Sequence, residues 1–63
     1  MKGIETLDLE LNDETAMALA MFIKRVSWSD LRDNAVTERE AWLMKEGIDK
    51  LQKALQEAGY APR

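Results

Sequence analysis

The apolar residues between Thr37 and Gly59 recur every three or four positions, the spacing of one face of an α-helix. Thr37 and Glu40 form a capping box, in which each side chain accepts a hydrogen bond from the other residue's amide. Gly59 can adopt the left-handed conformation that closes a helix, with Tyr60 folding back on Leu55. The pattern therefore predicts one long helix. The residues of its apolar face are Ala41, Met44, Ile48, Leu51 and Leu55.

A second helix is predicted from Asn12 to about Val26. Asn12 is a favourable N-cap, and the two acidic residues that follow suit the positive end of the helix dipole. The run from Ala16 to Ile23 is apolar throughout, so apolar surface extends beyond the face that meets the long helix. The residues outside that face are Met17, Met21 and Phe22. We therefore expect this helix to lie between the long helix on one side and the strand or a second subunit on the other. The methionines Met17, Met21 and Met44 would fill gaps in the core or form an adaptable interface.

The segment from Thr6 to Leu11 alternates strictly between leucine and polar residues, which is the period of a half-buried strand. The leucines would face the core, and Asp8 and Glu10 would face water. An isolated strand leaves its backbone groups without partners. We therefore expect this strand to pair with the same strand of a second copy, or to lie irregularly against the helices.

Ser29 and Asp30 indicate a short extra helix at 29–34, or a bent continuation of the preceding helix. The predicted fold is mainly α: a short N-terminal strand followed by a helical hairpin, in a single small domain over residues 1–63. A dimer formed through the strand is one option, since a chain this short gains burial by oligomerising.

The composition of the chain limits the classes of function that we expect. The chain has no cysteine and no histidine, and no apolar run approaches the roughly 20 residues that span a bilayer. No signal pattern opens the sequence, which favours a cytoplasmic location in a bacterial host. We expect neither an enzyme nor a bound metal or cofactor. The net charge of −3 is concentrated in residues 1–14, where five acids face one lysine, so direct nucleic-acid binding is not expected.

The first candidate binding site is this acidic end. On a strand, Asp8 and Glu10 would lie about 7 Å apart on one face. Together with Asp13 and Glu14, and with Glu5 nearby, they would form a row of carboxylates that imitates phosphates and occupies a basic channel on another protein. The alternative is a solvated strand face followed by ordinary helix-start acids.

The second candidate is Trp42, which lies opposite the apolar face of the long helix among charged residues. An exposed tryptophan is a suitable anchor for a partner protein. The alternative is that Trp42 packs on Trp28 and holds the connection against the start of the long helix.

The order strand, helix, helix, with the cap Ser27-x-Ser29-Asp30, resembles the ribbon-helix-helix family of dimeric DNA-binding regulators. The resemblance implies that outward strand residues read DNA, and the matching positions are Thr6, Asp8 and Glu10. Two carboxylates there would repel phosphates. The turn glycine that this family commonly has between its helices is also absent.

Two further stretches resemble small, uncharacterised helical proteins encoded on phages and plasmids. They are Asn12-Asp13-Glu14 leading into Ala16-Met17-Ala18-Leu19-Ala20, and the ending Ala58-Gly59-Tyr60-Ala61-Pro62-Arg63. Small acidic proteins of such elements include inhibitors of host defence, and some anti-CRISPR proteins are DNA mimics.

The leading prediction is therefore a small acidic protein-binding inhibitor of the anti-CRISPR or anti-defence type, which docks on a basic, nucleic-acid-handling protein. The alternatives are a ribbon-helix-helix-like dimeric regulator or antitoxin, and a structural module that assembles through Met17, Met21 and Phe22.

Overall fold

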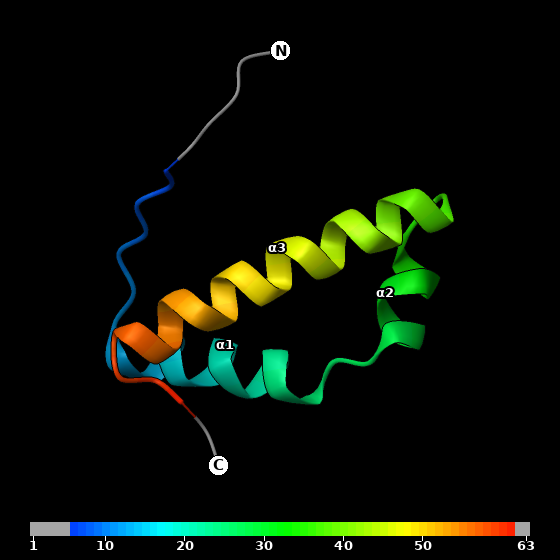
Figure 1. Cartoon of the computed structure of the whole chain (residues 1–63). Coiled ribbons are helices and arrows are strands. Elements are labelled where there is room, and N and C mark those ends of the chain that lie inside the picture. The colour runs from blue at the N-terminus through cyan, green and yellow to red at the C-terminus, as the bar shows by residue number, and fades with distance from the viewer. Residues whose placement is uncertain (1–5, 62–63) are drawn as a thin grey trace.

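The computed structural model describes residues 6–61, and Glu5 of the predicted acidic end lies outside them. Three helices follow one another: α1 spans Asp13–Arg25, α2 spans Trp28–Asn34 and α3 spans Glu38–Glu57. Both α1 and α2 pack against α3, α1 near its C-terminal half and α2 near its N-terminal half (Figure 1). The molecule measures 33 × 30 × 15 Å, so it is a thin body in which few side chains are enclosed on all sides.

The predicted long helix is confirmed at both ends. The Thr37 hydroxyl accepts a hydrogen bond from the Glu40 amide at 3.1 Å. The Glu40 carboxylate accepts from the Val36 amide at 3.1 Å, one residue before the amide that the capping box predicted. At the other end Gly59 has φ = 99°. The Tyr60 amide donates to the Leu55 carbonyl at 2.8 Å, and the Gly59 amide to the Gln56 carbonyl at 3.0 Å, which together form a Schellman motif.

N-terminal caps determine where the first two helices begin. Asn12 caps α1 as predicted, its side chain accepting from the Thr15 amide at 2.8 Å. The short extra helix also forms, but Ser27 rather than Ser29 begins it. The Ser27 hydroxyl accepts from the Asp30 amide at 3.2 Å, and the Asp30 carboxylate accepts from the Ser27 amide at 2.9 Å. This reciprocal pair begins α2 after two extended residues, Val26 and Ser27, that separate it from α1.

The predicted N-terminal strand is wrong, and with it the strand-helix-helix fold. Residues 6–11 lie extended in front of α1, and no part of the described chain is a β-strand. Leu7 is 73% exposed, Leu9 56% and Leu11 39%. Alternation alone was not sufficient, because leucine is a weak strand former and the described chain offers no second strand to pair with. A dimer formed through this strand therefore loses its basis.

The core lies between α1 and the C-terminal half of α3. Ala16, Ala20 and Ile23 of α1 are buried against Leu55 of α3. The half-buried residues that surround them are Leu19, Ile48, Leu51 and Tyr60. Ala41 is buried near the start of α3. Alanines let the helices approach closely, but they bury little apolar area. No helix in residues 6–61 is long and apolar enough to cross a membrane.

Candidate protein-binding surfaces

The acidic segment, residues 6–12, leads into α1 near the C-terminal end of α3 (Figure 1). Every residue from Thr6 to Thr15 is exposed. Within the described chain, the side chains of Asp8, Glu10 and Glu14 make no hydrogen bond or ion pair. These three carboxylates are therefore free to meet a partner.

Asp13, the fourth acid of the predicted site, is already engaged. Its carboxylate accepts a hydrogen bond from the Tyr60 hydroxyl, 47 positions away in the sequence. This bond, together with some desolvation and the negative charge of Asp13, raises the pKa of the Tyr60 phenol. Asp13 thus ties the start of α1 to the turn that follows α3, and we assign it to the fold rather than to partner binding.

The two tryptophans contact each other, as the alternative interpretation of the sequence expected. The ring centroids of Trp28 and Trp42 are 4.3 Å apart and their planes are tilted by 40°. The contact joins the first residue of α2 to the first turns of α3. Trp42 is still 56% exposed and Trp28 37%, so the pair stabilises the fold and also presents an aromatic surface.

The predicted site residues do not form one surface. Trp42 lies near the beginning of α3, whereas the acidic segment lies beside its other end (Figure 1). The 20 residues of α3 extend over about 30 Å. A partner that contacts the acidic segment therefore needs to span most of the molecule to reach Trp42 as well.

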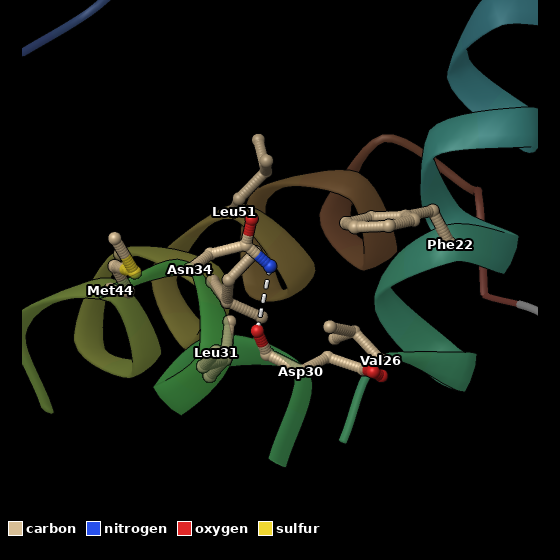
Figure 2. Close-up of a pocket in the computed structure, with 9 residues that line it drawn as sticks. Phe22, Val26, Asp30, Leu31, Asn34, Met44 and Leu51 are labelled. Atoms are coloured by element: carbon tan, nitrogen blue, oxygen red, sulfur yellow. Dashed lines mark hydrogen bonds between the residues drawn. The ribbon is translucent and has the colours of Figure 1, made fainter. Parts of the chain in front are cut away.

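The sequence analysis missed an apolar groove between the three helices. It is an open hollow of about 770 Å³. Its lining residues are Phe22, Val26, Asp30, Leu31, Asn34, Met44, Gly47, Ile48 and Leu51. Figure 2 shows Phe22 reaching from α1 into this space, with Met44 and Leu51 on α3 across from it. One feature of the sequence could have indicated this groove. The apolar run at 16–23 places Phe22 outside the face of α1 that packs on α3.

The polar side chains that line the groove, Asp30 and Asn34, bond to the backbone of α2 and its cap. The Asn34 side-chain amide donates to the Asp30 carbonyl at 2.7 Å (Figure 2). The Ser27 amide and hydroxyl both donate to Asp30 Oδ2, which lowers the pKa of the Asp30 carboxyl. The groove is consequently an apolar surface with its polar groups at the edge. In residues 6–61, no group of three or more potential ligands is placed to hold a metal ion.

The chain belongs to DUF7706, a family of unknown function, whose model matches residues 1–63. No curated protein and no solved structure matches the sequence. The family assignment brings no activity with it, so a functional proposal depends on the surfaces described above.

Proposed function

We propose that the protein is a non-enzymatic protein-binding inhibitor, of the anti-defence type carried by mobile genetic elements, whose acidic segment docks on a basic, nucleic-acid-handling protein. The supporting observation is the state of residues 6–12. They are extended and exposed, and the carboxylates of Asp8 and Glu10 have no partner within the described chain.

Asp8 and Glu10 are two residues apart in a segment that is neither helix nor strand, and both are exposed. Glu14, in the first turn of α1, continues the acidic surface. A row of negative charges of this kind can occupy a channel that normally binds phosphates. Its field speeds association and selects basic partners, and both effects weaken as salt is added.

The leucines of the same segment supply apolar contact. Leu7 and Leu9 are more than half exposed, and they alternate with the two carboxylates. Charge alone gives weak binding at physiological salt, because exposed ion pairs contribute little. Burial of two leucine side chains in the complex would add the larger share of the affinity.

The test is a pull-down from bacterial lysate with three proteins. The wild type is compared with Asp8→Lys, Glu10→Lys and with a charge-matched control, Asp33→Lys, Glu57→Lys, which alters exposed acids elsewhere. We expect the wild type and the control to retain the same nucleic-acid-binding protein, and the Asp8, Glu10 variant to lose it. Added duplex DNA should compete, and raised salt should elute the partner.

Two results would contradict the proposal. One is retention of the same lysate proteins by the wild type and both variants, since Asp8 and Glu10 would then only contact solvent. The other is binding that neither salt nor DNA weakens.

A ribbon-helix-helix-like regulator or antitoxin stays a prediction from the sequence, and nothing in residues 6–61 favours it. A gel shift at low salt with the purified protein and duplex DNA tests it directly.

A further inference from the structure

We propose that two copies of the chain associate through the groove between α1, α2 and α3, with Phe22 of each copy seated in the groove of the other. This inference does not depend on the proposed function, because Asp8 and Glu10 are not among the residues that line the groove.

The first argument is the amount of surface left exposed. A compact monomer of 7.2 kDa is expected to expose about 4,100 Å². The protein exposes 5543 Å², an excess of about 1,400 Å². A standard interface buries about 800 Å² on each partner, so the excess is large enough to supply one. The radius of gyration is also larger than that of a compact chain of this length, 12.7 Å compared with about 11 Å.

The exposed residues 6–12 before α1 account for part of this excess, and exposed apolar side chains on the helices contribute as well. Phe22 is 56% exposed, although it lies within a helix whose neighbouring face is buried. No large side chain is fully buried anywhere in the described chain. The three helices therefore enclose little apolar area for a chain without disulfides, and a second copy seated in the groove would add to it.

The groove has the composition of an interface core. Its walls are aliphatic and aromatic, and a phenylalanine projects into open volume (Figure 2). In a two-fold arrangement each contact occurs twice, so one protruding ring and one hollow on the same chain are self-complementary. The Phe22 ring of one copy would fill the space between Met44 and Leu51 of the other.

The edge of the groove carries charges of both signs. Arg25 and Asp30 line the adjoining hollow on either side of Val26. Asp30 uses Oδ2 to cap α2, and no hydrogen bond within the described chain uses its Oδ1. Two-fold pairing can place Arg25 of each copy near Asp30 of the other, which gives two equivalent ion pairs at the rim. The opposite signs avoid the repulsion that a one-sign edge would cause.

The experiment measures molar mass by analytical ultracentrifugation over a range of concentrations. The wild type is compared with Phe22→Arg and Gly47→Arg. Gly47 is suitable because it lines the groove and a Cβ added there meets nothing within 4 Å, so the substitution can begin without a clash in the single chain. The matched control is Gln52→Arg, which adds the same charge at an exposed position of α3 that does not line the groove.

We expect the wild type and Gln52→Arg to form dimers. Each groove variant should raise the dissociation constant by roughly tenfold or more, because a guanidinium would be buried without a partner. The midpoint of thermal unfolding of the wild type should also rise with protein concentration. The Asp8→Lys, Glu10→Lys variant should dimerise as the wild type does, which separates this inference from the proposed function.

A monomer whose unfolding midpoint does not change with concentration would overturn the inference. A dimer that persists equally in both groove variants would also overturn it, since the interface would then lie elsewhere. If a groove variant unfolds at low concentration and regains its fold at high concentration, folding is linked to this interface and the inference is supported. Circular dichroism over the same concentration range distinguishes that case from a concentration-independent loss of fold.

Discussion

The Tyr60 hydroxyl donates a hydrogen bond to the Asp13 carboxylate, and this bond joins the first turn of α1 to the turn that ends α3. Its position follows from the two caps. Asn12 fixes where α1 begins, and the left-handed Gly59 reverses the chain so that Tyr60 lies back over Leu55. The sequence signals for the two helix ends therefore also determine a long-range contact.

Replacing Tyr60 by phenylalanine should lower the midpoint of thermal unfolding at neutral pH, because the hydrogen bond is lost while the ring remains. The folded protein raises the pKa of Tyr60 above its ordinary value of 10.0. This contribution is therefore complete below pH 10 and is lost as the pH rises through the folded pKa. The two proteins should converge in stability at strongly alkaline pH, as measured by urea unfolding at several pH values.

The double variant Tyr60→Phe, Asp13→Ala is the control for this assignment. The two changes remove the same hydrogen bond, so their effects should be less than additive. Additive effects, or a Tyr60→Phe difference that persists unchanged at strongly alkaline pH, would show that the effect does not come from the hydrogen bond to Asp13.

The contact between Trp28 and Trp42 should appear as a coupling energy. We expect a double-mutant cycle with Trp28→Leu and Trp42→Leu to give about 0.5–1.5 kcal/mol of favourable interaction, as is typical of aromatic pairs. Urea unfolding of the four proteins measures it. The matched control replaces Trp42→Leu by Leu43→Ala, the exposed neighbour on α3. That cycle should give a coupling near zero, and equal coupling in the two cycles would contradict a specific ring contact.

Helix ends could be predicted from the sequence more reliably than the N-terminal segment. The caps at Asn12, Thr37 and Gly59 depend on residues within four positions, so local chemistry decides them. Residues 6–11 have the period of a strand, but a strand also needs a partner elsewhere in the chain. Periodicity contains no information on that partner, and in the described structure none is present.

In the candidate sites, too, features that depend on nearby residues could be predicted from the sequence, and features that depend on helix packing could not. Exposure of Asp8 and Glu10 followed from their charge and their place before a helix. The engagement of Asp13 with Tyr60 and the groove beside Phe22 depend on how α1 lies on α3, which the sequence pattern alone does not specify. The contact between the tryptophans was one of two open alternatives, because the path of the chain between α1 and α3 decides it.

The two described glycines should respond in opposite ways to substitution by alanine. Gly59 has a left-handed backbone, so Gly59→Ala should destabilise the protein by about 1–2 kcal/mol. Gly47 lies in the interior of α3 with open space around it in the single chain, so Gly47→Ala should stabilise the monomer by about 0.5–1 kcal/mol. Urea unfolding at concentrations where the chain is monomeric measures both. A loss of stability in Gly47→Ala under these conditions would contradict the open space around this position.

Acid should weaken the cap of α2 in a defined pH range. Bonds from the Ser27 amide and hydroxyl lower the pKa of Asp30 below its ordinary value of 3.8. The stabilising contribution of the charged carboxylate is therefore complete above about pH 5, declines as the pH falls through 3.8, and is lost below the folded pKa. Asp30→Asn should accordingly be less stable than the wild type at pH 7 and should approach it in stability as the pH falls below the folded pKa of Asp30. Asp33→Asn, on the same helix but without a contact to Ser27, is the control for general charge effects. If the two variants show the same pH dependence, the reciprocal cap between Ser27 and Asp30 is not what holds the start of α2.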